Sequence, residues 1–328
     1  MDRSPELRTI TLEEHFATRA YLDGAGRRLT EQARPGQGEL LERLLDVGEG
    51  RIAEMDAAGI DVQVLSLTAP GTEQLDAAEA VALAHASNEA LREAVRHYPD
   101  RLAGFAVLPM ARPEQAADEL ERAIRGYGFK GAVVNGHVRG RYLDDPYFWP
   151  VLERAEGLRV PIYLHPTPPP QAVIEAHFTG NFSPEVSGVF ASAGWGWHIE
   201  TALHALRLIL GGAFDRYPGL QIIVGHLGET LPFMLPRLDR TMPPALTKLD
   251  RPIGSYLREN FNYTFSGFNF PPTYLDLMLE VGIDRIMFSA DYPFASMAEA
   301  RQFLMQLPVS PADRARIAHG NAERLLRM

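Results

Sequence analysis

The stretch Gln221-Ile-Ile-Val-Gly-His226-Leu-Gly-Glu229 joins a short apolar run to a turn and to the start of a helical pattern. Apolar, β-branched runs of this length are typical of buried strands, and the glycines after them mark turns. We count eight such runs, centred on residues 10–15, 62–67, 102–108, 131–135, 160–165, 220–226, 261–264 and 285–289. Eight strands that alternate with helices close most naturally into a parallel barrel, so the sequence predicts an α/β fold of the (β/α)8 TIM-barrel type.

Segments with helical periodicity separate these runs. They lie near residues 39–58, 74–97, 113–127, 146–156, 197–216, 228–240, 271–281, 296–306 and 311–326. A length of 328 residues is ordinary for a barrel with insertions, so we predict one domain over residues 1–328. Two connections, residues 16–38 and 166–195, are too long for plain loops, and both follow the C-terminal end of a strand. Because that face carries the active site of a barrel, we interpret both insertions as lids.

Composition excludes several classes of function. The 32 Lys and Arg residues face 42 Asp and Glu residues, which gives a formal net charge of −10, so nucleic acid and membrane are not expected partners. No cysteine occurs, so disulfides, thiolate metal sites and cysteine nucleophiles are excluded. The first ten residues lack the apolar segment of a signal peptide, and no stretch approaches the roughly 20 apolar residues that span a bilayer. We therefore expect a cytoplasmic protein.

Ionisable residues follow four of the predicted strands at the point where each strand ends. Glu13 and His15 end the first run, and His165, His226 and Asp291 follow the fifth, sixth and eighth runs. Side chains two residues apart in a strand point to the same face, so Glu13 and His15 are expected to enter the barrel mouth together. A single such residue is often a capping group, but the ends of several strands of one barrel meet at one point. The pattern predicts a metal ion held by Glu13, His15, His165 and Asp291, with His226 beside it.

The donor types indicate which ion is bound, and how many. Two imidazoles and two carboxylates suit Zn2+, our first choice, and Mn2+ nearly as well, and they leave positions open for water or substrate. Two-metal sites of this architecture commonly bridge their ions through a carbamylated lysine on the fourth strand. The only lysines are Lys130 and Lys248, and neither ends that strand. We therefore expect one divalent ion and no organic cofactor.

Other candidate residues lie around this constellation. Glu229 stands three residues after His226 and either orients its imidazole or caps the helix that begins there. Arg237 lies eleven residues after His226, about 16 Å along a helix, so it is either a surface residue or a residue that reaches a neighbouring subunit's pocket. Trp197 and Phe294 are candidate contacts for an aromatic substrate, although aromatic residues at such spacing are often core. Helical positions suggest structural roles for His85, His97, His204 and His319, whereas three histidines in loops stay unassigned: His137, His177 and His198.

Several stretches of the chain resemble motifs of the amidohydrolase superfamily. They are residues 12–16 (Leu-Glu-Glu-His-Phe), 65–70, 200–207, 225–229 and 285–294. The similarity covers nearly the whole chain and is to the decarboxylase-like branch, which contains aminocarboxymuconate semialdehyde decarboxylase and the nonoxidative decarboxylases of gamma-resorcylate and 2,3-dihydroxybenzoate. The resemblance implies four ligands (Glu13, His15, His165, Asp291), a catalytic pair (His226, Glu229), a substrate-contacting Arg237, and a homodimer or homotetramer.

The start of the ligand pattern bears on the reaction. Hydrolytic members of the superfamily typically begin His-x-His, whereas this chain begins Glu13-x-His15, as the decarboxylase-like branch does. We therefore expect a metal-dependent carboxy-lyase that acts on a hydroxylated aromatic acid such as a hydroxybenzoate. The alternative is hydrolysis of an ester, lactone or amide at the same site, and a metal-free barrel that only binds a ligand is a third possibility. Residues 167–170 and 192–199 depart from the family pattern, which leaves the particular substrate open.

Overall fold

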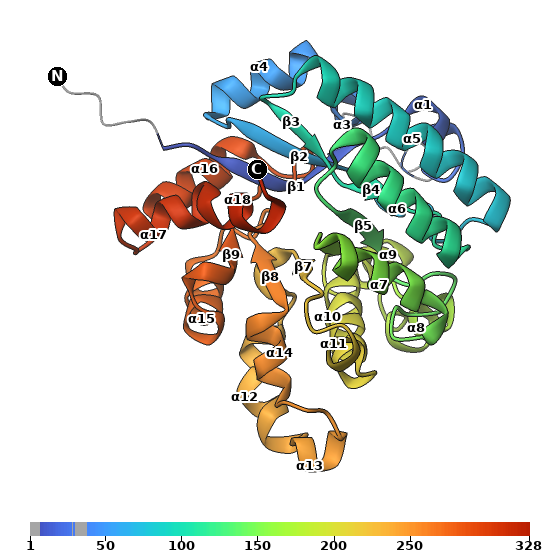
Figure 1. The fold of residues 1–328 in the computed structure, drawn as a ribbon, viewed down its shortest axis with the longest axis vertical. Coiled ribbons are helices and arrows are strands. Elements are labelled where there is room, and N and C mark those ends of the chain that lie inside the picture. The colour runs from blue at the N-terminus through green and yellow to red at the C-terminus, as the bar shows by residue number, and fades with distance from the viewer. Residues whose placement is uncertain (1–6, 28, 30–37) are drawn as a thin grey trace.

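The architecture is a set of parallel strands surrounded by helices (Figure 1). The computed structural model describes residues 7–27, 29 and 38–328. All paired strands are parallel. The strands are β1 (Ile10–Phe16), β2 (Val62–Leu67), β3 (Leu102–Gly104), β4 (Ala106–Val107), β5 (Ala132–Asn135), β6 (Ile162–His165), β7 (Ile222–Val224), β8 (Phe261–Thr264) and β9 (Ile286–Met287). All eight predicted runs therefore contain a strand, and the third contains two.

Hydrogen bonds link the three-stranded sheet β1-β2-β3 to the six-stranded sheet β4 to β9 on both sides. Phe105 separates β3 from β4, and its N–H donates to the carbonyl of Leu65 at 2.9 Å, while the next N–H, of Ala106, donates to Gly131 at 2.8 Å. On the other side the N–H of Leu12 donates to the carbonyl of Phe288 at 3.2 Å. The strands thus surround one interior in chain order, as the predicted barrel requires.

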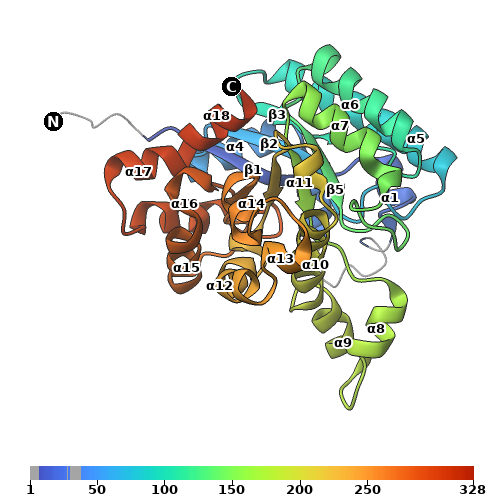
Figure 2. The ribbon, with the colours of Figure 1, turned by 60° about the horizontal axis from the view of Figure 1, so that its bottom comes forward.

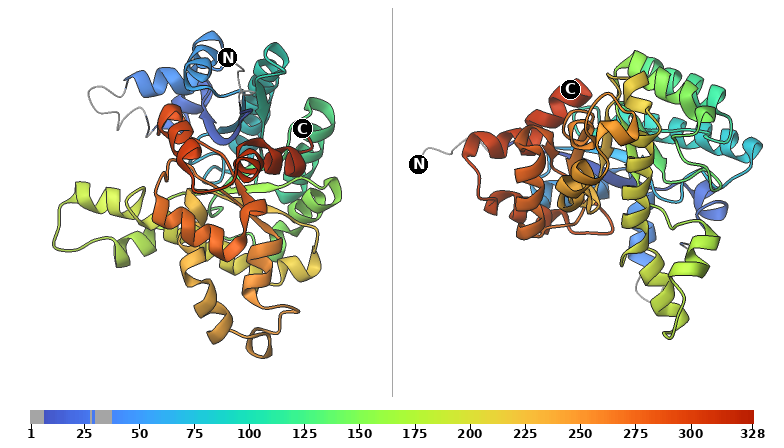
Figure 3. Two further views of the ribbon diagram at one scale, coloured as in Figure 1. Left: turned by 90° about the vertical axis from the view of Figure 1, so that its left-hand side faces the viewer. Right: turned by 90° about the horizontal axis from the view of Figure 1, so that it is seen from below.

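Helices connect the strands and cover them on the outside (Figures 1 and 3). They are α1 (Arg19–Asp23), α3 (Gly38–Leu45), α4 (Glu49–Ala58), α5 (Ala77–His97), α6 (Pro113–Tyr127), α7 (Trp149–Leu158), α8 (Gln171–His177), α9 (Pro184–Ala191), α10 (Gly196–Leu210), α11 (Ala213–Arg216), α12 (Leu231–Thr241), α13 (Pro244–Thr247), α14 (Ile253–Glu259), α15 (Pro271–Val281), α16 (Met297–Gln306), α17 (Pro311–Ala315) and α18 (Asn321–Leu326). No helix among the described residues is both long enough and apolar enough to cross a membrane.

Some helices differ from the prediction. Residues 39–58 form two helices, α3 and α4, because the carboxylate of Asp46 accepts the N–H of Gly48 at 2.8 Å and so replaces a helical hydrogen bond. The insertion at 166–195 contains α8 and α9, which project from the barrel as a helical hairpin (Figure 2). Of the other predicted insertion, residues 16–38, the structure shows α1, and residues 28 and 30–37 lie outside the described residues.

A β-bulge in the first strand directs the side chains at its end. β1 pairs Leu12 with Val64 and Glu14 with Leu65, so Glu13, at φ 71°, has no partner in the ladder. Leu12 belongs to the apolar cluster inside the barrel, and Phe16 to the cluster between strands and helices. Simple alternation from Leu12 would have turned Glu14 inward. The bulge changes the phase, so that Glu13 and His15 face the mouth, as predicted but for a different reason.

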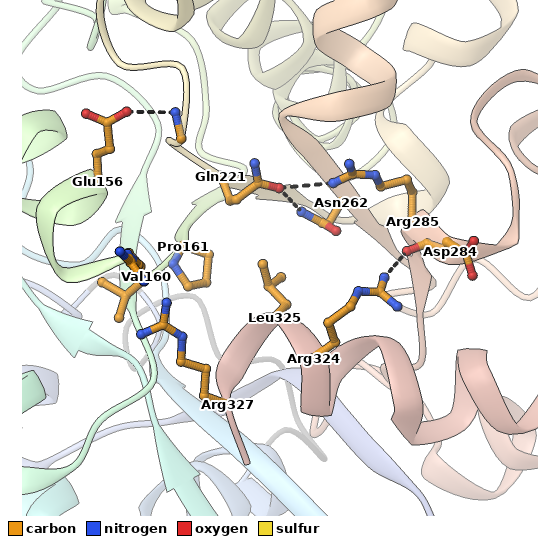
Figure 4. Close-up of a pocket in the computed structure, with 12 residues that line it drawn as sticks. Glu156, Val160, Pro161, Gln221, Asn262, Asp284, Arg285, Arg324, Leu325 and Arg327 are labelled. Carbon is orange, nitrogen blue, oxygen red and sulfur yellow. Dashed lines mark hydrogen bonds between the residues drawn. The ribbon is translucent and has the colours of Figure 1, made fainter.

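A cavity of about 720 Å3 lies at the opposite end of the barrel, near the residues that precede the strands (Figure 4). Its lining includes Pro161, Gln221, Arg285 and the last helical turn with Arg324. Gln221 accepts hydrogen bonds from Arg285 at 3.0 Å and from Asn262 at 3.1 Å, which tie the starts of neighbouring strands together. Bonds of this kind at the amino ends of strands serve stability rather than catalysis in a barrel.

Arg51 of α4 connects that helix to the first strand. Its guanidinium is fully buried and donates to the carbonyls of His15 and Asp46, both at 2.7 Å, and to Gln63 at 3.2 Å. No sequence pattern had suggested this role.

We predict that Arg51→Met lowers the free energy of unfolding by about 2–4 kcal/mol, because it removes the guanidinium donors from the carbonyls of His15, Arg43 and Asp46. The control is Arg43→Met, since the side chain of Arg43 is 46% exposed and pairs with Glu54 alone among the described residues, and it should cost less than about 1 kcal/mol. Chemical denaturation measures both, and equal losses would contradict the role of Arg51.

Candidate metal centre

The four predicted ligands come together at the C-terminal ends of three strands. Glu13 and His15 lie in β1, His165 ends β6, and Asp291 follows β9. One ligand atom from each lies within 4.8 Å of all the others. Nε2 of His15 is 3.0 Å from Oδ1 of Asp291, and Nε2 of His165 is 3.3 Å from Oε1 of Glu13. The side chains are buried except that of Asp291, which is 17% exposed.

The carboxylate of Glu13 is held from one side only. Its Oε2 accepts hydrogen bonds from the hydroxyls of Tyr163 and Ser266, and Thr264 Oγ1 lies at 3.4 Å. Its Oε1 is buried and accepts no hydrogen bond from the described residues, and Nδ1 of His15 is likewise buried without a partner among them. Buried polar atoms normally have partners, so two orphans in one cluster of metal-binding side chains fit a cation site. Sequence reasoning missed the three hydroxyls, which lie within or just after strands and carry no motif.

Burial sets the protonation of this cluster. It raises the pKa of Glu13 well above its usual value and that of Asp291 to about 7. It also lowers the pKa of His15 to about 3, and that of His165 well below its usual value. Both imidazoles are therefore neutral and keep a lone pair, and the charge of His226 only partly offsets the effect of burial on the two carboxyl groups. Neutral imidazole and ionised carboxylate are the forms that bind a metal, and a divalent cation would lower both carboxyl pKa values.

His226 lies beside the cluster and is joined to Glu229. Its Nδ1 is 2.7 Å from Oε1 of Glu229 and 3.9 Å from Oε1 of Glu13. Burial opposes the charged imidazole, but the carboxylates of Glu229 and Glu13 outweigh it and raise the pKa of His226 to about 10. Of the two interpretations of Glu229, the structure favours the orienting one, since α12 begins without a side-chain cap.

His198, which the sequence left unassigned, binds the other oxygen of Glu229. Its Nδ1 is 2.6 Å from Oε2 of Glu229, and its ring lies 4.7 Å from the ring of His226. The only sequence signal was its place in the segment 192–199, which departs from the family pattern.

Backbone strain accompanies the inward-pointing side chains. Glu13, His226, Glu229 and Asp291 have φ values of 71°, 49°, 53° and 64°. Residues other than glycine seldom adopt this left-handed conformation, which costs about 1–3 kcal/mol each and is concentrated at functional sites. The surrounding structure must therefore hold these turns in place.

Aromatic rings lie around the two clusters. Phe294 is 46% exposed, and its ring centroid is 5.4 Å from that of His15, which places it where the sequence expected a substrate contact. The indole N–H of Trp197 donates to Nε2 of His198 at 3.0 Å, so this residue has a structural partner. Phe268, which was not predicted, packs 5.1 Å from the rings of both His198 and His226.

Arg237 is not joined to these residues. It lies on the exposed face of α12, and within the described part of the chain its side chain makes no hydrogen bond or ion pair. The histidines expected to be structural have protein partners: Glu119 for His85, Glu93 for His97, Leu143 for His204 and Glu323 for His319.

Comparison with known proteins places the chain in a family. The model of an amidohydrolase family matches residues 41–328. The chain belongs to this family. The gamma-resorcylate decarboxylase of Polaromonas sp. (strain JS666 / ATCC BAA-500) is 39% identical to it over 335 residues, which cover 97% of this chain and 98% of the relative.

Solved structures agree with this assignment. A 2,6-dihydroxybenzoate decarboxylase complexed with 2,6-dihydroxybenzoate matches with a TM-score of 0.86 and 36% identity, covering 98% of this chain and 99% of that one. A dihydroxybenzoic acid decarboxylase from Polaromonas sp. JS666, with bound manganese and the inhibitor 2-nitroresorcinol, matches with a TM-score of 0.87 and 39% identity, covering 98% and 97%. The expected amidohydrolase barrel is confirmed, and the enzyme is a metal-dependent carboxy-lyase.

Gly225, which precedes His226, leaves room for the carboxylate of Glu13. A Cβ at this position would lie 2.4 Å from Oε2 and 2.9 Å from Oε1 of Glu13, and 2.8 Å from the hydroxyl of Ser266. Its φ of −81° suits any residue, so the close approach alone requires glycine.

We predict that Gly225→Ala weakens Mn2+ binding by about tenfold or more, because displacing a ligand or the groups that orient it has effects of this size. The matched control is Gly126→Ala in α6, where a Cβ would meet nothing within 4 Å. Calorimetric titration of the metal-free proteins measures both, and unchanged binding in Gly225→Ala would show that Glu13 does not ligate the ion.

Proposed function

We propose that this enzyme removes the carboxylate of an aromatic acid that carries a hydroxyl ortho to it, with one divalent ion held by Glu13, His15, His165 and Asp291. The observation that carries the proposal is the cluster of these side chains, in which two buried ligand atoms have no hydrogen-bond partner in the described part of the chain. Related decarboxylases that act on gamma-resorcylate or bind 2,6-dihydroxybenzoate support the substrate class. Since the related Polaromonas structure carries manganese, Mn2+ replaces Zn2+ as our first choice.

The rings beside the clusters suit an aromatic substrate. Phe294 stands beside His15, and Phe268 stands beside His226, so apolar surface adjoins both polar groups. We propose that the substrate ring packs against these side chains in offset or edge-to-face contact, which is worth about 0.5–1.5 kcal/mol per pair beyond the buried area. Its carboxylate and hydroxyl then point toward the four predicted ligands.

A divalent ion bound by these four residues would act as a Lewis acid and withdraw electrons from the carboxylate and the neighbouring hydroxyl of the substrate. Asp291 moves the proton. Burial raises the pKa of Asp291, which favours uptake of the proton of the substrate hydroxyl, and a bound divalent ion would lower the pKa of that hydroxyl. It then delivers that proton to the ring carbon that bears the carboxylate, as the phenolate electrons shift into the ring to form the C–H bond. The electron pair of the carbon–carboxylate bond returns to the ring, CO2 leaves, and the phenolate product takes a proton from water.

His226 supplies positive charge beside these steps. Because its charged form is stabilised by Glu229, the imidazolium is available to hold the substrate in place and to balance negative charge on the ring. His226 is also close enough to the cluster to serve as the acid if Asp291 does not, and a variant of each residue separates the two assignments.

We predict that the Mn2+-loaded protein releases CO2 from at least one ortho-hydroxybenzoate, and that in D2O one deuterium appears at the vacated carbon. Asp291→Asn should lose at least about 10³-fold in turnover, because it removes the proton carrier. Asp118→Asn, at a position 76% exposed on α6, is the control and should keep full activity. Bound Mn2+ is measured in each variant, so that loss of the ion and loss of the acid are told apart. If the Mn2+-loaded protein released CO2 from none of a set of ortho-hydroxybenzoates, the proposal would be contradicted.

We also propose that the chain forms one domain and assembles as a homodimer or homotetramer through the face of α12. Phe233 and Met234 on this helix are 77% and 42% exposed, which is unusual for large apolar side chains. Arg237 lies on the same exposed side, so a second copy seated there would receive its guanidinium. The cytoplasmic location stays a prediction.

We predict that Arg237→Ala and Asp291→Asn, each inactive alone, restore activity when the two chains are co-expressed. If Arg237 serves the neighbour's site, half of the dimers are mixed and one of their two sites is intact, so about a quarter of wild-type turnover returns. Arg240→Ala, from the same helix, should stay active alone. A monomeric mass in light scattering, or no recovery in the mixture, would contradict the proposal.

A further inference from the structure

Glu229 is shared between two imidazoles, of which the proposed mechanism uses one. Its Oε1 lies 2.7 Å from Nδ1 of His226, and its Oε2 lies 2.6 Å from Nδ1 of His198. The carboxylate is fully buried, and the side chain of His198 is 8% exposed. A carboxylate bound at both oxygens cannot rotate freely, so the bond from His198 fixes the plane of the Glu229 carboxylate to which His226 is hydrogen-bonded.

The tautomer of His198 follows from its other neighbour. Nε1 of Trp197 lies 3.0 Å from Nε2 of His198, and an indole N–H can only donate. The carbonyl of Ala193 also lies 3.2 Å from Nε2 and could accept only from a protonated Nε2, but the shorter contact with the indole N–H favours an Nε2 without a proton. A neutral ring with a bare Nε2 carries its proton on Nδ1, and so His198 donates to Glu229. Trp197 therefore donates to His198, and His198 donates to Glu229.

We infer that His198 is a positioning residue: its Nδ1–H holds the carboxylate of Glu229 in the orientation that aims His226 at the metal centre. Trp197 supports it by fixing the tautomer. Among the described contacts, His198 bonds to none of the four proposed ligands, so its effect on the reaction passes through Glu229 and His226.

Two other roles for this cluster fit the contacts less well. A second ion held by His198, His226 and Glu229 would have to displace hydrogen bonds at both carboxylate oxygens and at Nε2 of His198, all of which have protein partners. Simple packing would account for the ring contacts with Phe268 and His226, but not for a 2.6 Å bond between a ring nitrogen and a buried carboxylate.

Trp197 and His198 link the pair His226 and Glu229 to the insertion at residues 166–195. Trp197 and His198 lie in the first turn of α10, directly after the hairpin of α8 and α9. The carbonyl of Trp197 also accepts the hydroxyl of Thr201 at 2.7 Å, which anchors that turn to the helix. The first turn of α10, which follows the hairpin, thus provides the hydrogen bond that holds Glu229.

The test uses two matched substitutions in the metal-loaded protein. His198→Phe keeps a ring against Phe268 and removes the donor, whereas His198→Asn places an amide N–H near the position of Nδ1. We expect kcat for hydroxybenzoate decarboxylation to fall by about 10- to 100-fold in His198→Phe, with KM changed less than about threefold. His198→Asn should recover to within about fivefold of wild type.

A readout without turnover accompanies the kinetics, because the kinetic effect rests on the proposed function and the hydrogen bond does not. Nitrogen-15 NMR of histidine in the Zn2+-loaded protein should show a proton on Nδ1 of His198 and none on Nε2. The slowly exchanging Nδ1 proton of His226 should persist in His198→Asn and be lost in His198→Phe.

Three results would overturn the inference: kcat of His198→Phe within twofold of wild type, equal losses in the Phe and Asn variants, or a His198 proton on Nε2. If wild-type protein decarboxylates no hydroxybenzoate, the proposed function fails, and the tautomer and the His226 proton still decide the role of His198.

Discussion

The carboxylate of Glu13 is held by hydroxyls on one oxygen and is left without a partner on the other, and the rest of the site depends on this asymmetry. Tyr163, Thr264 and Ser266, from two other strand ends, surround Oε2. Oε1 then faces His165 and His226. The arrangement requires a bulge that turns Glu13 inward and a glycine at position 225 that leaves room for it. A hydroxyl shell that fixes a carboxylate in this way prepares it to bind a cation without further rearrangement.

Charge is distributed over the site in two parts. Around Glu13 and Asp291 the carboxylates outnumber any cation and the imidazoles are neutral, which favours a divalent ion. Around Glu229 the balance is reversed, because one carboxylate stabilises a protonated imidazole. The two parts meet at His226, which lies 3.9 Å from Glu13. A bound ion beside a fixed imidazolium offers two positive groups to a substrate that carries a carboxylate and a hydroxyl. The strained turns at these residues are the cost of placing both parts at one mouth.

The sequence predicted much of this arrangement because barrel topology brings strand ends together. Once the eight runs were recognised, the meeting of Glu13, His15, His165 and Asp291 followed from the fold alone. The bulge did not follow, since alternation is counted along an ideal strand and a single inserted residue reverses it. Buried partners such as Tyr163 and Arg51 were also missed, because a polar residue inside an apolar pattern does not reveal what it binds. His198 lay in a segment that departs from the family pattern, and only its distance to Glu229 gives it a role.

The most direct test of the central claim is the anomalous diffraction of crystals grown with Mn2+. The structure predicts one peak, bound by Glu13, His15, His165 and Asp291. A peak between His198 and Glu229 instead, two peaks at the mouth, or none would contradict the assignment of these four residues as the ligands of a single catalytic ion.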